Sequence, residues 1–227
     1  MLIKFAEVSK KFGSSYAVSN INLEIQGGEF VFLVGPSGAG KSTLLRLLSR
    51  QTLPTSGKIL IDDKDITKLK NSDIPYYRRK VGFVFQDFKL LDDRTVYENV
   101  AIALEVRNYP EEDISKEVER ILKLFEIWSR RNLFPNQLSG GEAQRTAIAR
   151  AIIGKPDILL ADEPTGDLDP QTSWGVIQLL NEINSWGTTV IMATHNAEIV
   201  NTLKRRVVAV KDGKVLRDKR EGRYEIH

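Results

Sequence analysis

The first third of the chain has the hydrophobic pattern of β-strands. Apolar and polar residues alternate across 3–6 and across 21–25, the period of a strand with one buried face. Residues 29–34 are almost continuously apolar, as expected of a strand that is buried on both faces. Further strands are predicted at 58–61 and 80–85. The chain therefore begins with a β-rich part.

The middle of the chain changes to the spacing of helices. Apolar residues recur every three to four positions across 95–105, 110–125 and 141–153. An earlier helix is predicted from Lys41 to about Arg50, directly after the apolar run at 29–34 and a glycine-rich turn.

Buried strands return in the last third. They are predicted at 158–161 and 189–193 with a helix between them, and two short strands close around the turn Asp212-Gly213. Strands, then a helical insert, then strands again indicate an α/β protein. We therefore predict one domain over 1–227, with a helical subdomain at 86–155 inserted in an α/β core.

Composition adds few constraints. The 227 residues are 41% hydrophobic and 28% charged, as in an ordinary globular protein. The net charge is only +3, and much of the basic excess lies at 211–223 among acidic residues. Because this excess is too small and too diluted to track phosphates, no nucleic-acid partner is expected.

Several chemistries are excluded or disfavoured by what the chain lacks. It has no cysteine, so disulfides and thiolate metal sites are ruled out, and its two histidines, His195 and His227, are too few for a histidine-rich metal site. The first residues do not form the apolar stretch of a signal peptide, and no apolar run approaches the ~20 residues of a spanning helix. If the protein works at a membrane, we expect another chain to supply the spans.

One glycine-rich stretch fits the phosphate-binding pattern G-x-x-x-x-G-K-[ST]. It joins the strand predicted at 29–34 to the helix that begins at Lys41, which is the context this pattern requires. Backbone N–H groups and the helix N-terminus would cradle phosphates, Lys41 would reach the β- and γ-phosphates, and Ser42 would ligate Mg²⁺. The candidate nucleotide-binding residues are Gly35, Pro36, Ser37, Gly38, Ala39, Gly40, Lys41, Ser42 and Thr43.

A second motif places two carboxylates after the strand at 158–161. Taken alone, Asp162 and Glu163 are typical of surface acids at a strand end. Following a P-loop, the pair favours catalysis, with Asp162 holding Mg²⁺ through water and Glu163 activating the attacking water.

A third motif, Leu138-Ser139-Gly140-Gly141-Glu142, predicts a helix N-terminus with a capping box. It is also a second anion-binding helix end in a chain whose P-loop already holds the phosphates. One nucleotide cannot easily use both ends within one compact subunit. A second copy that supplies this element in trans is the simplest explanation.

The stretch 138–145, LSGGEAQR, resembles the signature motif of ATP-binding cassette (ABC) ATPases, and the family's other motifs follow in its order. Gln86 resembles the Q-loop glutamine, residues 166–169 resemble the D-loop, and His195 resembles the switch histidine. Phe12 resembles the aromatic residue on which adenine stacks, although a lone Phe is more often part of a core. The resemblance covers essentially the whole chain.

The resemblance implies a fold and a mechanism. The fold is a P-loop NTPase core with a RecA-like mixed sheet, an N-terminal antiparallel β subdomain and an inserted helical subdomain. The activity is ATP hydrolysis with Mg²⁺ in a homodimer that forms in the ATP state, and closure moves a separate integral membrane subunit through a groove beside the Q-loop. The implied roles are catalysis for Glu163, His195, Lys41 and Gln86, metal binding for Ser42, Gln86 and Asp162, and nucleotide binding for Phe12, the P-loop, Ser139, Gly140, Gly141 and Asp169.

Three local stretches resemble one subgroup, the bacterial cell-division ATPases. These stretches are 74–80, 85–91 and 94–101. The subgroup implies a peripheral location on the cytoplasmic face of the inner membrane, control of cell-wall hydrolysis through the membrane subunit, and contacts with cytoplasmic division proteins. The ATPases of lipoprotein-releasing or macrolide-type exporters remain an alternative, because they share the run 160–166.

Two further alternatives come from other classes. A soluble ABC protein acting on DNA or ribosomes would usually carry a long coiled-coil insertion or two fused halves, and neither is evident. A regulatory scaffold with little turnover is disfavoured by Glu163 and His195. Two departures from the family pattern are Asp167 in the D-loop, which adds negative charge near the expected dimer seam, and the lack of a glycine at 48–51.

Overall fold

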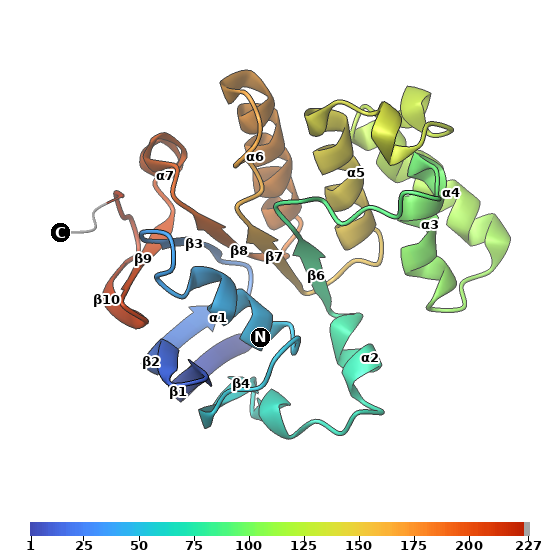
Figure 1. Cartoon of the computed structure of the whole chain (residues 1–227). Coiled ribbons are helices and arrows are strands. Elements are labelled where there is room, and N and C mark those ends of the chain that lie inside the picture. Colours follow the sequence, from blue (N-terminus) through green and yellow to red (C-terminus); the bar gives the residue numbers. More distant parts are fainter. Residues whose placement is uncertain (225–227) are drawn as a thin grey trace.

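The computed structural model of the chain describes residues 1–224 and has two sheets and seven α-helices over that range (Figure 1). It confirms the predicted α/β class. His227 lies outside the described residues. No helix within 1–224 has the length and hydropathy needed to cross a bilayer.

The central sheet has six strands in the order β10-β9-β3-β8-β7-β6. Their bounds are β10 Lys214–Lys219, β9 Arg206–Lys211, β3 Phe30–Val34, β8 Thr189–Thr194, β7 Ile158–Asp162 and β6 Val81–Val84. Strands β9, β3, β8, β7 and β6 run parallel, and only β10 is antiparallel to its neighbour. Strand β3 is buried along its whole length, as its apolar run predicts.

The N-terminal sheet is antiparallel, in the order β2-β1-β4-β5. Its strands are β1 Leu2–Phe12, β2 Ser15–Gln26, β4 Ser56–Ile61 and β5 Lys64–Asp65. Helix α1 (Lys41–Leu48) lies between this sheet and the central one (Figure 1). Its buried leucines join Ile3 and Ile21 on one side and Val31 and Leu33 on the other in one apolar cluster, so α1 is held from both sides.

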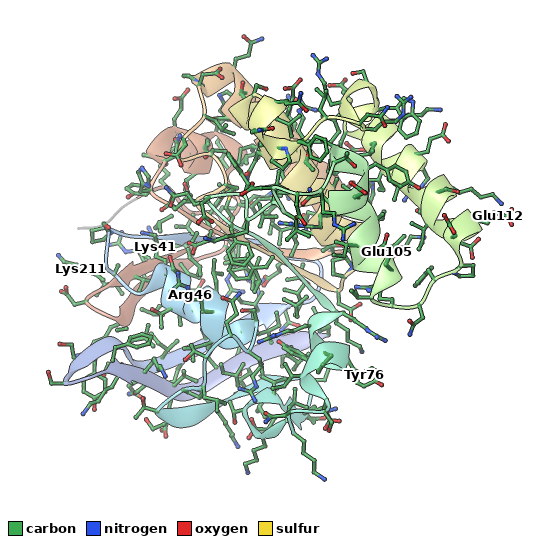
Figure 2. The ribbon with its side chains drawn as sticks, turned by 45° about the vertical axis from the view of Figure 1, so that its right-hand side comes forward. Lys41, Arg46, Tyr76, Glu105, Glu112 and Lys211 are labelled. Carbon is green, nitrogen blue, oxygen red and sulfur yellow. The ribbon has the colours of Figure 1, made fainter. Side chains whose placement is uncertain are left out.

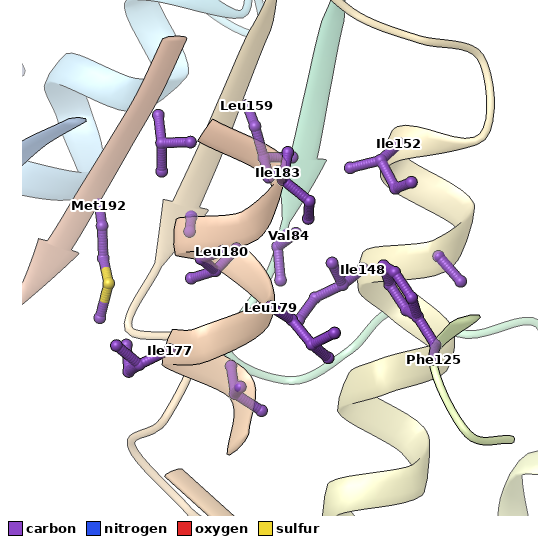
Figure 3. Close-up of a cluster of buried hydrophobic side chains, with 14 of the residues drawn as sticks. Val84, Phe125, Ile148, Ile152, Leu159, Ile177, Leu179, Leu180, Ile183 and Met192 are labelled. Carbon is purple, nitrogen blue, oxygen red and sulfur yellow. The ribbon is translucent and has the colours of Figure 1, made fainter. Parts of the chain in front are cut away.

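The other face of the central sheet carries the remaining long helices. They are α3 Val96–Glu105, α4 Glu111–Leu124, α5 Gly140–Ile152 and α6 Pro170–Ser185. Figure 3 shows Leu180 and Ile183 of α6 and Ile148 of α5 beside Val84 and Leu159 of the strands, within one large apolar cluster. Helix α3 packs against α4 and α5, away from the N-terminal sheet (Figure 1).

Short helices are the main difference from the sequence-based assignment. Neither α2 (Ile74–Arg78) nor α7 (Ala197–Leu203) was predicted, and three 3₁₀ turns are present at 66–68, 128–130 and 135–137. With five and seven residues, α2 and α7 are too short to display a clear helical period. Both are stabilised by tertiary contacts that periodicity does not reveal.

Candidate functional site

Four parallel strands bring the sequence motifs to one edge of the central sheet. Gly35 follows β3, Gln86 lies just beyond β6, Glu163 follows β7, and His195 follows β8. The carboxyl ends of parallel strands meet at the same edge, where α/β proteins bind ligands. Residues up to 160 positions apart in the chain therefore line one site.

The glycine-rich loop is shaped to leave helix N–H groups open. Gly40 precedes α1 with φ 105°, and no side chain caps the helix N-terminus. A Cβ at Gly40 would lie 2.5 Å from the carbonyl oxygen of Ala17, so no other residue fits there. The first amides of α1 thus have no side-chain acceptor, which is the arrangement that binds phosphate.

Lys41 points into this loop. The residue is 6% exposed, and Nζ donates hydrogen bonds to the carbonyl oxygens of Gly35 at 2.8 Å and Pro36 at 3.1 Å. The same Nζ lies 3.8 Å from Oε1 of Glu163. A buried ammonium held by carbonyl oxygens and one carboxylate is a strong attractor for a polyanion.

Glu163 has an unusual backbone for a residue with a side chain. Its φ is 48°, in the left-handed region, which costs on the order of 1 kcal/mol or more. Its Oε2 lies 3.0 Å from Nδ1 of His195 and accepts a hydrogen bond from the His195 backbone N–H at 3.2 Å. The carboxylate is thereby aimed between the imidazole and the Lys41 ammonium.

Ser42 and Asp162 form a pair of oxygen donors beside Lys41. The Ser42 hydroxyl donates to Oδ1 of Asp162 at 2.8 Å. Burial raises the pKa of Asp162, and the hydrogen bond from Ser42 partly opposes that shift. A carboxylate and a hydroxyl at this distance are ligands that suit a hard divalent cation, whose charge would offset the burial of Asp162.

Two adjoining cavities surround these side chains. One of ≈ 530 Å³ is lined by residues 37–43 of the P-loop together with Gln86, Glu163 and His195, whereas Gly35 and Pro36 do not line it. The other, of ≈ 740 Å³, is lined by Phe12, Asp162 and Asp167 and shares Ser42 and Gln86 with the first. Phe12 is 55% exposed and is therefore not a core residue. Phe12 and the P-loop therefore line neighbouring cavities, and Nζ of Lys10 lies 5.0 Å from the centre of the Phe12 ring.

Gln86 also contacts the D-loop. Its Nε2 donates to Oδ2 of Asp167 at 3.5 Å, a long hydrogen bond. Asp169 is engaged locally, because its carboxylate accepts from the Thr172 backbone N–H at 3.0 Å and caps α6. In this single chain the Asp169 carboxylate therefore stabilises its own helix.

The signature segment forms the predicted capping box but lies apart from the cavities. The Ser139 hydroxyl accepts from the Glu142 N–H, and Glu142 in turn accepts from the Ser139 N–H at 2.8 Å. Neither of the two cavities is lined by Ser139, Gly140 or Gly141. A Cβ at Gly141 would lie 2.5 Å from Thr172, so this glycine lets α5 approach α6.

Two residues that the sequence analysis did not single out hold the loop after Gln86. Asn99 is fully buried in α3, accepts from the Leu91 N–H at 2.8 Å, and donates to the carbonyl oxygens of Leu91, Arg94 and Thr95. Arg150 of α5 donates to the Phe88 carbonyl oxygen at 2.8 Å. A polar residue at a buried helical position is the signal that identifies Asn99.

Comparison with known proteins gives a consistent assignment. The family model described as ABC transporter matches residues 18–166. The chain therefore belongs to the ABC transporter family, as an ATPase subunit with the cassette fold. This confirms the fold class and the activity that the resemblance implies.

Two relatives and one solved structure show which subgroup of the family this chain resembles. The chain is 52% identical over 224 residues to the cell division ATP-binding protein FtsE of Bacillus subtilis, covering 98% of each protein. It is 46% identical over 213 residues to FtsE of Escherichia coli K12, covering 93% of this chain and 96% of that protein. The dimeric post-hydrolysis structure of the ATP-binding cassette MJ0796 bound to ADP and Pi has a TM-score of 0.88 and 39% identity, covering 97% of this chain and 99% of that one.

Proposed function

We propose that this chain is the ATPase subunit of an FtsE-like cell-division complex. It binds ATP as a homodimer and drives an FtsX-like integral membrane subunit at the cytoplasmic face of the bacterial inner membrane. That movement regulates cell-wall hydrolysis, and cytoplasmic division proteins are further partners. The near full-length identity to FtsE proteins supports this assignment.

The side chains of the cavity have complementary roles in this proposal. Lys41 exchanges the carbonyl oxygens of Gly35 and Pro36 for the β- and γ-phosphates, and the open amides of α1 bind the remaining phosphate oxygens. Glu163 orients the attacking water and accepts its proton. His195, 3.0 Å from Glu163, contacts the γ-phosphate and fixes the carboxylate. Phe12 stacks on adenine with its exposed ring.

The residues beside Lys41 fit a magnesium site. Ser42 and Asp162 would hold the ion, and Gln86, which lines both cavities with Ser42, would complete the set. Bound Mg²⁺ would neutralise negative charge on the phosphates. Asp167 accepts a hydrogen bond from Nε2 of Gln86, which leaves the amide oxygen, the atom that would bind the ion, available.

A second copy completes the site. The signature residues Ser139, Gly140 and Gly141 line neither cavity of their own chain, which supports their use on the nucleotide of the partner. Asp169 lies in the same D-loop region and joins the seam between the copies. The MJ0796 cassette, which is dimeric and bound to ADP and Pi, is a precedent of similar structure.

The helical part of the chain connects this chemistry to the membrane subunit. We assign 86–155 as a helical subdomain, since α3, α4 and α5 pack against one another. The contact surface comprises Phe88, Leu90 and Leu91, on the loop after Gln86 that Asn99 and Arg150 hold, together with Tyr97 in the first turn of α3. Movement of α5 is therefore passed directly to that loop.

The convergence of Lys41, Gln86, Glu163 and His195 on one cavity carries the proposal. Its test is Glu163→Gln. ATP binding is retained, hydrolysis falls about hundredfold to ten-thousandfold, and the dimer persists in ATP because turnover no longer reopens it. Equilibrium binding of a fluorescent ATP analogue, phosphate release and size-exclusion chromatography with and without ATP measure the three effects.

The matched control is Glu182→Gln, an exposed acid on α6 that lines neither of the two cavities. It removes the same charge and leaves turnover and assembly unchanged. A Glu163→Gln protein that stays monomeric in ATP and hydrolyses it at the wild-type rate would refute the proposal. Co-purification with an FtsX-like protein from detergent-solubilised membranes tests the partner separately.

A further inference from the structure

The segment 74–80 is divided between an inward and an outward side. On the inward side, the buried Tyr77 hydroxyl donates to the Leu48 carbonyl oxygen at the end of α1. Arg78 donates to the Arg50 carbonyl oxygen at 2.9 Å and to that of Ser49 at 3.4 Å. These contacts satisfy the carbonyl end of the P-loop helix and fully account for Tyr77 and Arg78.

The outward side has no such explanation. Tyr76 is 64% exposed and projects away from the body of the protein (Figure 2). The Arg79 guanidinium lies 4.9 Å from the centre of the Tyr76 ring and also donates to the Val106 carbonyl oxygen at 3.2 Å. An exposed ring fixed by a cation is a preorganised contact surface.

The same surface continues over the connection between α3 and α4. Val106 is 62% exposed and Tyr109 is 46% exposed. Between them, Arg107 donates to the carbonyl oxygens of Gly154 and Arg79, which ties α2, α3 and the end of α5 together. We call Tyr76, Arg79, Val106, Arg107 and Tyr109 the aromatic–arginine patch.

The patch carries positive charge that nothing in the described part of the chain neutralises. Arg79 and Arg107 take no part in any ion pair within residues 1–224, and their guanidinium hydrogen bonds go to backbone carbonyl oxygens. Burial lowers the pKa of Arg107, with Tyr109 opposing this shift and Arg79 adding to it. Asp73 and Glu105 flank the patch in sequence without pairing with it. An anionic partner would meet uncompensated cations here.

We propose that the aromatic–arginine patch binds an acidic peptide segment of a partner protein, one that carries bulky apolar side chains among its carboxylates. Carboxylates pair with the guanidiniums in the planar geometry that arginine favours. The apolar side chains pack on Tyr76, Val106 and Tyr109, which form the kind of exposed apolar surface that marks protein contacts.

The patch is separate from the surface assigned to the membrane subunit. Phe88 and Leu91 precede α3, whereas Val106 and Tyr109 follow it. The ten residues of α3 put about 15 Å between the two surfaces. Through Tyr77 and Arg78 the patch is also tied to α1, whose other end is Lys41. An acidic partner bound here therefore contacts α2 and the end of α3, and it is linked to the P-loop helix only through the neighbouring Tyr77 and Arg78.

Fluorescence anisotropy with a short labelled peptide of Asp and Glu residues interspersed with Leu and Phe tests the proposal on the full chain. Saturable binding that weakens with added salt is expected. Arg79→Glu weakens it by about tenfold or more, and Tyr109→Ala by severalfold. The controls Arg220→Glu and Trp186→Ala alter an exposed cation and an exposed aromatic residue elsewhere and leave binding unchanged.

A charge exchange separates direct contact from misfolding. A second peptide has Lys in place of every acidic residue, and the Arg79→Glu protein binds it more tightly than the wild type does. The Arg79→Gln protein keeps the wild-type melting temperature but loses binding to the acidic peptide. Equal wild-type affinity for the Lys and acidic peptides overturns the proposal. So does binding only to phosphatidylglycerol vesicles or to poly-uridine RNA, or acidic-peptide affinity that is the same in wild type and patch variants.

Discussion

Two helix N-termini with similar glycine-rich sequences differ in how they are satisfied. At α1, Gly40 offers no side chain, and the first amides have no side-chain cap. At α5, Ser139 and Glu142 cap each other, and Arg130 donates to the other Glu142 oxygen at 2.6 Å. The first end is incomplete without an anion, whereas the second carries a carboxylate of its own.

This difference fits the two roles proposed for these helix N-termini. The α1 end, with Lys41 buried beside it, attracts a polyanion within a single chain. The α5 end is already capped within the single chain, which is consistent with its proposed use on the nucleotide of a second copy. The proposal therefore predicts that one subunit binds ATP alone and that the α5 end acts only in the dimer.

Removing the cation from the open end has the largest expected effect. Lys41→Ala removes the buried ammonium from the phosphate-binding cavity. The rate of ATP hydrolysis falls about hundredfold to thousandfold, and the affinity for ATP falls as well. Phosphate release and titration with a fluorescent ATP analogue measure both. Lys116→Ala, which removes an exposed ammonium on α4, serves as the control and changes neither. Retained affinity in Lys41→Ala would mean that the amides of α1 suffice.

Changing the capped end separates binding from assembly. Ser139→Ala keeps ATP affinity in the monomer, because Ser139 lines neither cavity, but it slows turnover about tenfold to hundredfold through the lost contact in the dimer. It also costs about 1 kcal/mol of stability through the lost cap. Loss of monomer affinity would show that the division between the two ends is wrong. Urea unfolding and analogue titration distinguish the effects.

The smallest expected effect is a pH dependence at the capped end. The hydrogen bond from Arg130 and the backbone hydrogen bond from Ser139 lower the pKa of Glu142 below its ordinary 4.5. A lowered pKa contributes stability above the ordinary value that is lost as the pH falls through the lowered one. Glu142→Gln therefore unfolds more easily than wild type at neutral pH, by about 0.3–1 kcal/mol, and the difference shrinks below pH 4.5 and disappears once the pH is below the lowered pKa of the folded state. Chemical unfolding across this pH range tests it.

The sequence carries much of the fold and of the motif chemistry because both follow local rules. The apolar run of β3 and the alternation at 21–25 predict a buried central strand and a half-buried strand, and both are present. Lys41 and Glu163 belong to motifs whose strand context is visible in the sequence. Their convergence on one edge follows from parallel strands, although the role of each side chain stays a prediction.

The rest depends on contacts between distant segments. Arg50 adopts φ 56°, and Arg78 of α2 donates a hydrogen bond to its carbonyl oxygen. In the sequence, residues 48–51 show only the lack of the glycine that is common in the family. Asn99 bonds to a loop several residues before it, and Arg150 reaches that loop from another helix. No periodicity encodes which buried amide or guanidinium will meet which carbonyl oxygen, because packing alone decides it.

The left-handed backbone of Glu163 restricts how this position can change over evolutionary time. Asn, Asp and Gly tolerate such a conformation, whereas Val, Ile and Thr do not. Under the proposed catalytic role of Glu163, a relative that loses hydrolysis through a substitution here and stays folded is expected to carry Gly, Asn, Asp or Gln. Relatives of this subunit that no longer hydrolyse ATP would then be recognisable from one substitution at this position, with the fold unchanged.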